Sequence, residues 1–364
     1  MIYWIVFLLV EYILLASFTT KKDKTFRAIV LFLIVLIAVY FAGFRDLLGM
    51  DYDGYRDHCE GDRYLGDTLW FLNEPIYELI RNFCATTQFS AVIFFLLFAA
   101  FTSVPALVIY SKYDNFFLSG FVYLTYTGLY LFSFNVVRQF AAAGILMIGA
   151  YYLLKGGLKN KCIFVSIVIL AALIHKSALF FLPVLFITNK DFNPTIILLL
   201  LILSFVIPFE NLFGISQLSA LLGMMDYDIY INDSAVMISK YSLSNLYLHV
   251  LLMLLLLNKK RISSLKDSEV YVFSIKMFVV YLICNNLSAN GIPIAYRTGI
   301  LFAMYIPLAL SILPQLLKGR VVSYLIIIPL LILFFAIGMS NDIVVPDRML
   351  PLNSIFDSEY IKFR

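Results

Sequence analysis

The sequence predicts an all-α, multi-pass integral membrane protein with about 12 crossings, including a short hairpin. Hydrophobic residues make up 62% of the 364-residue chain and charged residues only 14%, whereas roughly one quarter of a soluble domain is charged. Long apolar segments recur along the chain, and the polar stretches between them are too short to fold alone. We therefore predict a single transmembrane domain over residues 1–364.

Apolar runs define the predicted spans in order along the chain. The first run, 2–18, has no basic region before it and carries its Lys/Arg cluster afterwards, so we expect a retained span and not a cleaved signal peptide. The remaining runs are 26–43, 88–110, 116–134, 140–154, 162–174 with 177–188, 194–209, 243–258, 269–287, 298–315 and 321–339.

The basic connections between the apolar runs predict which side of the membrane each connection lies on. The Lys/Arg-rich connections are Lys21 to Arg27, Lys155 to Lys161, Lys259 to Lys266 and Lys318 to Arg320. The positive-inside rule places all of them in the cytoplasm. Only three apolar runs lie between Lys161 and Lys259, and three crossings would put Lys259 outside. One run must therefore turn round within the membrane, and we expect it to be 162–188, because His175 and Lys176 interrupt it.

The two arms of this hairpin are short. Arms of 12 or 13 residues reach only about 20 Å, less than the roughly 30 Å hydrocarbon core. We predict a dipping hairpin whose tip points outward. The same alternation puts both termini outside, with periplasmic loops 44–87 and 210–242 and a periplasmic C-terminal tail 340–364.

Unusual polar residues collect at the predicted outer face. Arg45, Arg138 and Arg297 lie at the ends of different spans, and His175 lies at the hairpin tip. Ionisable groups at membrane depth mark functional sites by default. Arginine suits phosphate because its guanidinium stays charged and offers a planar fork of donors. We predict a pyrophosphate pocket in which His175, Arg138 and Arg297 are catalytic. The predicted substrate-binding residues are Arg45, Asp51, Tyr52, Tyr55, Asn135, Gln139, Lys176 and Tyr296.

Simpler interpretations of these residues stay open. Each arginine can be an interfacial anchor, His175 can satisfy a neighbouring carbonyl group, and Lys176 can extend to the outer interface. The segment Asp51 to Tyr55 lacks the ligand pattern of an EF-hand. The cysteines and histidines show no metal-binding spacing, so we expect no metal and no cofactor. A disulfide between Cys59 and Cys84, which share one outer loop, also stays open.

The order of the polar motifs resembles the EpsG-like, Wzy-type polysaccharide polymerases. The matching segments, from Gly43 to Arg297, are GFRDLLGMDYDGY after the second span, NVVRQ opening a later helix, HKSAL at the hairpin and a late YR. The resemblance implies an O-antigen or exopolysaccharide polymerase with a GT-C-like fold in the bacterial inner membrane. Its active site would face the periplasm.

The resemblance also implies a reaction and partners. Such enzymes transfer a growing glycan from undecaprenyl pyrophosphate to the non-reducing end of another lipid-linked repeat unit, and the arginines can supply the charge that a metal provides elsewhere. The implied partners are undecaprenyl-pyrophosphate-linked oligosaccharides, membrane lipids and a separate chain-length regulator. We expect no nucleic-acid partner.

Three other functions compete with this interpretation: an O-antigen ligase, a membrane O-acyltransferase, and a flippase or transporter of lipid-linked glycan. A transporter predicts ionisable residues near the midplane and broken helices within repeated halves. The chain instead groups its polar residues on one face and shows no clear repeat, which favours an enzyme. Only the family resemblance separates a polymerase from a ligase.

Overall fold

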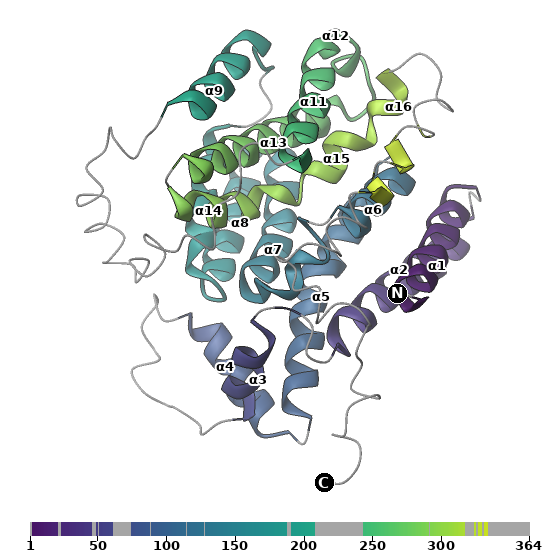
Figure 1. The fold of residues 1–364 in the computed structure, drawn as a ribbon, viewed down its shortest axis with the longest axis vertical. Helices are drawn as coiled ribbons and strands as arrows, with labels where there is room; N and C mark the ends of the chain where they lie inside the picture. The colour runs from purple at the N-terminus through teal and green to yellow at the C-terminus, as the bar shows by residue number, and fades with distance from the viewer. Residues whose placement is uncertain are drawn as a thin grey trace. The chain divides into compact units, whose positions relative to one another are not determined.

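The structure is a computed structural model that is helical in every regular element it describes (Figure 1). It describes residues 2–20, 23–45, 49, 51–60, 74–87, 89–113, 115–126, 128–187, 191–207, 243–290, 292–316, 324, 327–329 and 331–333. The all-α prediction is confirmed for this part of the chain. The predicted loop 210–242 and tail 340–364 lie outside the described residues. The chain divides into two compact units: Met1–Leu179 with Val321–Arg364, and Phe180–Arg320.

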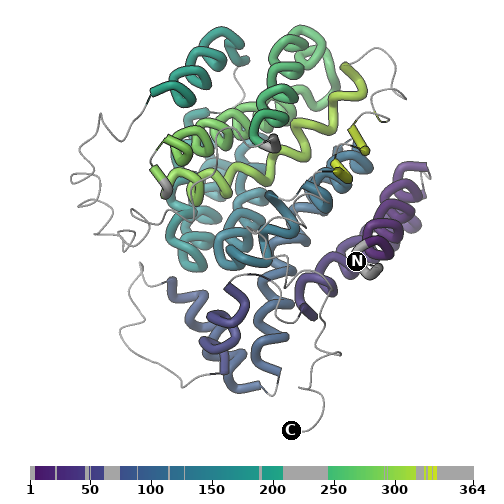
Figure 2. The backbone as a smooth tube through the Cα atoms, viewed as in Figure 1, coloured from purple at the N-terminus to yellow at the C-terminus, as the bar shows by residue number. Residues whose placement is uncertain are grey.

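Helix α5 (Ser90–Tyr110) is the centre of the first unit. Helices α2, α3, α4 and α7 all pack against it, while α1 packs against α2 and α6, and α8 against α7. The tube in Figure 2 follows α1 and α2 as a pair of neighbouring helices. The other bounds are α1 Ile2–Thr20, α2 Lys24–Gly43, α3 Tyr52–Glu60, α4 Pro75–Ala85, α6 Phe116–Thr125, η2 Phe132–Phe134, α7 Val137–Leu154 and α8 Gly157–Ala172.

Helix α13 (Ser268–Ala289) has the same role in the second unit. It packs against α9, α11, α14 and α15. Their bounds, with the two remaining short helices, are α9 Pro194–Val206, α11 Leu243–Leu257, α12 Lys259–Ile262, α14 Pro293–Ala303, α15 Ile306–Ser311 and α16 Leu313–Leu316. The 3-10 helix η3 (Lys176–Phe186) continues from the end of the first unit into the second.

Four helices of the described chain, α2, α5, α7 and α13, are long and apolar enough to cross a bilayer. The bent pair 294–303 and 306–316 would make a fifth span. These helices agree with a membrane protein. The 12 crossings, the GT-C-like fold and the single transmembrane domain stay predictions.

Two predicted spans are interrupted. The run 116–134 is not one helix, because α6 ends at Thr125, where Tyr126 takes an extended conformation, and turns and a 3-10 helix follow. The run 298–315 bends by 50° between its two helices. Pro307 lies at the start of the second helix, where its missing N–H cannot continue the hydrogen-bond ladder.

The predicted break at His175 is confirmed. Helix α8 ends at Ala172, and η3 begins at Lys176 after a short turn. The second arm is 3-10 in type and contains Pro183, which lacks a donor for an α-helical hydrogen bond. The return of both arms to the same side of the membrane stays a prediction.

Candidate active site

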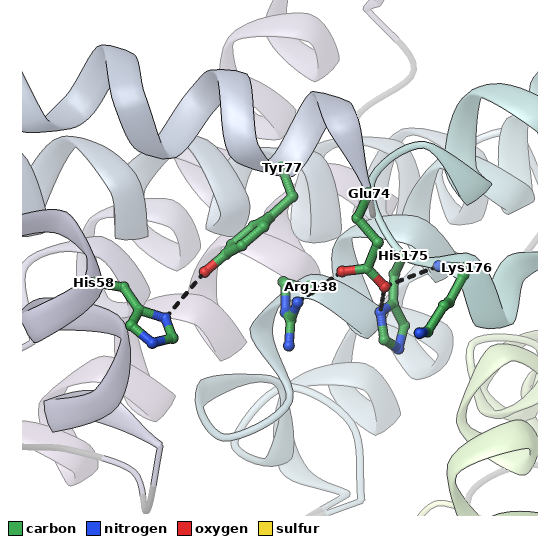
Figure 3. A network of polar contacts seen from close by, with 6 residues as sticks. All are labelled: His58, Glu74, Tyr77, Arg138, His175 and Lys176. Carbon is green, nitrogen blue, oxygen red and sulfur yellow. Dashed lines mark hydrogen bonds and ion pairs between the residues drawn. The ribbon is translucent and has the colours of Figure 1, made fainter. Parts of the chain in front are cut away.

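Glu74 is the centre of a cluster of ionised and polar groups in the first unit (Figure 3). Its Oε2 accepts from Nη1 of Arg138 at 2.6 Å, and its Oε1 pairs with Nδ1 of His175 at 2.7 Å. The backbone N–H of Lys176 donates to the same Oε1 at 3.0 Å. Two predicted catalytic residues therefore meet on one carboxylate that sequence reasoning did not select.

Helix ends bring these groups together from distant parts of the sequence. Glu74 directly precedes α4, Arg138 is in the first turn of α7, and His175 occupies the turn between α8 and η3. A backbone hydrogen bond of 2.9 Å from Ile76 N to Leu173 O joins the start of α4 to the end of α8. This bond fixes the spacing between Glu74 and the histidine turn.

Glu74 has an unusual backbone conformation. Its φ of 54° and ψ of 59° lie in the left-handed region, which non-glycine residues rarely adopt. It is the N-cap of α4, yet its side chain makes no capping hydrogen bond to that helix. The carboxylate is directed instead to Arg138 and His175. Backbone strain of this kind is typical of functional sites, where the surrounding structure enforces it.

The cluster keeps the Glu74 carboxylate ionised. Burial by itself raises the pKa of Glu74, since only 6% of its side chain is exposed. The hydrogen bond and charge of His175, the charge of Arg138 and the Lys176 N–H outweigh burial and lower the pKa to about 2. Glu74 is therefore an anion that organises the site at neutral pH.

His175 is held in the tautomer that a general base needs. A carboxylate can only accept, so Nδ1 of His175 carries a hydrogen and donates it to Glu74. In the neutral ring the lone pair then belongs to Nε2. Glu74 would also stabilise the imidazolium formed when Nε2 takes a proton, which is the role of the carboxylate in acid–base dyads.

Arg138 lies between two aromatic rings and remains accessible. Its guanidinium carbon is 4.6 Å from the centroid of the Tyr77 ring and 5.9 Å from that of Tyr55. About a third of its side chain, 32%, is exposed, against 12% for His175. The hydroxyl group of Tyr77 in turn pairs with Nδ1 of His58 at 3.4 Å. The arginine is thus oriented by its neighbours, while about a third of its side chain is exposed.

Arg45 contacts the protein itself. It is 3% exposed, its guanidinium stacks on the rings of Phe95 and Phe134 at 4.1 and 4.8 Å, and it donates to the carbonyl oxygens of Ala42 and Phe134. Burial lowers the pKa of Arg45 to about 10, which leaves it charged at neutral pH. These contacts join the end of α2 to the turn before α7. Phosphate binding by Arg45 stays a prediction.

Most of the other predicted contact residues of the first unit are buried in the packing around the cluster. Tyr52 stacks on Phe95 and Tyr55 on Phe94, with 3% and 8% exposed, while Asp51 is exposed. Asn135 and Gln139 are also buried, and Lys176 is half-buried. The Nε2 of Gln139 donates to Ser177 Oγ at 3.4 Å. Substrate contacts by these residues stay predictions.

Tyr296 and Arg297 belong to the second unit. Both lie on α14 and both are half-buried. Their predicted roles in substrate binding and catalysis are therefore not part of the geometry of the Glu74 cluster, and they stay predictions.

The question left open for Cys59 and Cys84 has an answer in the structure. Both residues are buried free thiols on the neighbouring helices α3 and α4. Among the described residues, no three His, Cys, Asp or Glu side chains gather as a candidate metal site. Metal independence of the reaction stays a prediction.

The amino-acid sequence matches the model of a known protein family. The family model described as "EpsG family" matches residues 28–354, nearly the whole chain. This chain belongs to the EpsG family. EpsG membership indicates a polysaccharide polymerase-type membrane protein, in agreement with the apolar helices. Searches of curated proteins and of solved structures gave no significant match.

Proposed function

We propose that this EpsG-family protein is a lipid-linked oligosaccharide polymerase, a glycosyltransferase that extends a glycan carried on undecaprenyl pyrophosphate at the periplasmic face. The observation that supports it is the convergence of Arg138 and His175 on the Glu74 carboxylate. Transfer from a lipid pyrophosphate needs a base for the acceptor hydroxyl and positive charge for the departing phosphate. The cluster offers both within one set of contacts.

The chemical step assigns one role to each residue. The acceptor hydroxyl oxygen attacks the anomeric carbon of the donor glycan, and its proton passes to Nε2 of His175. The bond between that carbon and the pyrophosphate oxygen breaks, and the electron pair leaves with the pyrophosphate. Arg138 stabilises the negative charge that develops there, and Glu74 stabilises the imidazolium. The glycan is now longer, and the carrier leaves as undecaprenyl pyrophosphate.

Glu74 refines the role of Arg138. The Glu74 carboxylate partly offsets the charge of the Arg138 guanidinium, so Arg138 does not act through its net charge alone. Its guanidinium is also held in one orientation by Glu74 and the Tyr77 ring. Pre-orientation of this kind lowers the cost of ordering the side chain when a phosphate binds. Lysine does not reproduce a planar fork.

Substitution of Arg138 tests the proposal in cells. A strain lacking the gene should carry single repeat units and no long chains on its surface, and the wild-type gene should restore them. Arg138→Ala should fail to restore them, with a loss of about 10²–10³ in rate, and Arg138→Lys should fail almost as badly. Analysis of surface polysaccharide length, with protein level measured in parallel, gives the result.

Glu78→Gln is the matched control for this experiment. Glu78 is one turn along α4 and its side chain pairs with Arg81 at 2.8 Å, so its loss should leave chain length normal. Wild-type chain length from Arg138→Ala cells at normal protein level would refute the role of Arg138. Loss of single-repeat products in the deletion strain would indicate a flippase or a ligase instead.

A further inference from the structure

Uncharged polar side chains join three helices of the second unit. Asn286 on α13 donates from Nδ2 to Ser204 Oγ on α9 at 3.0 Å and to Nε2 of His249 on α11 at 3.2 Å. Nδ1 of His249 is bonded to the backbone carbonyl of Asn245 at 2.8 Å. The carbonyl can only accept, so Nδ1 carries the hydrogen and Nε2 accepts. These contacts explain how α9 and α11 are held to α13.

A neighbouring face of α13 is not explained by helix packing. Asn285 and Ser288 are three residues apart and share one face, with 3% and 0% exposed. Asn285 Oδ1 and Ser288 Oγ have no hydrogen-bond partner among the residues that the structure describes. A buried polar atom without a partner costs about 1–3 kcal/mol. Side chains needed only for packing would be apolar here.

Helix α14 packs against α13 beside this face. A Cβ atom added to Gly299 would come within 2.9 Å of the Cys284 Cβ, so α13 and α14 approach closely at this level. The two helices are joined by a short connection and pack along one another, as an antiparallel hairpin does. In that register Asn285 and Ser288 lie within about one helical turn of Arg297 along the hairpin axis.

We infer that Asn285 and Ser288 form a subsite for the hydroxyl groups of a sugar. Amide and hydroxyl oxygens accept from sugar hydroxyls, and the two side chains carry no charge that would require a counter-ion. Arg297, one turn away, suits the phosphate to which such a sugar is attached. That the sugar is carried on a lipid pyrophosphate rests on the proposed function.

The position of the subsite along its helices agrees with a glycan ligand. It lies at the end of α13 opposite to the basic α12, which contains Lys259, Lys260 and Arg261. The positive-inside rule assigns that basic end to the cytoplasm. The subsite then belongs at the outer face, where the proposed reaction takes place.

Paired binding measurements test the subsite without relying on catalysis. The purified full-length protein in nanodiscs is titrated with undecaprenyl pyrophosphate alone and with undecaprenyl pyrophosphate carrying the repeat-unit oligosaccharide. The wild-type protein should prefer the glycosylated lipid. Asn285→Leu and Ser288→Ala should each reduce that preference roughly tenfold and leave affinity for the bare lipid unchanged. Asn258→Leu, directly before the basic α12, is the control and should keep the preference.

Thermal unfolding separates ligand binding from a structural role. Replacing an unpartnered buried amide by an apolar side chain of similar size should leave the melting temperature unchanged or raise it. A large fall in melting temperature for both variants would overturn the inference, since it would show that the groups serve packing or a structural water. Equal wild-type affinity for the two lipids, or an unchanged preference in both variants, would also overturn it. A preserved binding preference without polymer synthesis would refute the proposed function and leave the subsite in place.

Discussion

Glu74 makes the stability of the protein sensitive to acid. The pKa of Glu74 in the folded protein is about 2, below its ordinary value of 4.5, so the unfolded chain binds more protons as pH falls. The carboxylate therefore stabilises the fold fully above about pH 4.5, and its contribution disappears as pH falls towards 2. The size is roughly 3 kcal/mol, as an order of magnitude.

Melting temperatures between pH 2 and pH 7 measure this effect in detergent. Glu74→Gln should melt below the wild-type protein at pH 7, and the two curves should converge as pH falls towards 2. Glu78→Gln should follow the wild-type curve much more closely, because among the described residues the Glu78 carboxylate forms an ion pair with one partner, Arg81. A constant difference between wild type and Glu74→Gln across the whole range would show that the charge of Glu74 does not provide the stability.

Sequence reasoning selected Arg138 and His175 as candidates but did not select the residue that joins them. Glu74 is 64 residues from Arg138 and 101 from His175, and it lies in an acidic loop where no spacing distinguishes it. Only the position directly before Pro75, at a helix start, hinted at a special backbone. Pairing across such distances depends on tertiary packing, which single-sequence patterns do not encode.

At the scale of elements, the backbone just before α3 requires a glycine at position 49. Gly49 has a φ of +104°, and a Cβ there would come within 2.8 Å of Asn135 Oδ1 and of the Phe134 carbonyl oxygen. Gly49→Ala should destabilise the protein by about 1 kcal/mol or more. Gly54→Ala is the matched control, since among the described residues no atom beyond its chain neighbours and its own helix backbone lies within 4 Å of the added methyl group, and alanine favours the helix. Equal melting temperatures for the two variants would contradict this account of the turn.

The elements show where hydropathy is sufficient and where it is not. Long apolar runs predicted α2, α5 and α13 within a few residues, because a membrane span needs both length and apolar composition. His175 and Lys176 marked the end of α8, because two ionisable residues interrupt the apolar composition that a span needs. The end of α6 at Thr125 was missed, since most of the residues that follow are also apolar or aromatic and only Gly128 signals a turn.

At the scale of the whole molecule, the charge pattern predicts which side each loop faces. A variant with its four cysteines replaced by alanine, carrying either Lys176→Cys or Lys159→Cys, can be labelled with a membrane-impermeant maleimide. Lys176→Cys should react from the periplasm in intact cells, and Lys159→Cys only after the inner membrane is opened. The reverse pattern would overturn the predicted topology and the periplasmic placement of the site together.

Catalysis by the Glu74 cluster is tested most directly by polymerisation with purified protein in liposomes. His175→Asn keeps a side-chain N–H that can reach Glu74 but removes the nitrogen that would take the proton. The wild-type protein and Glu78→Gln should convert lipid-linked repeat units into a ladder of longer glycans. His175→Asn, at the same melting temperature, should slow ladder formation by about 10²–10⁴-fold. A ladder that forms at the wild-type rate in His175→Asn would contradict the assignment of this cluster as the active site.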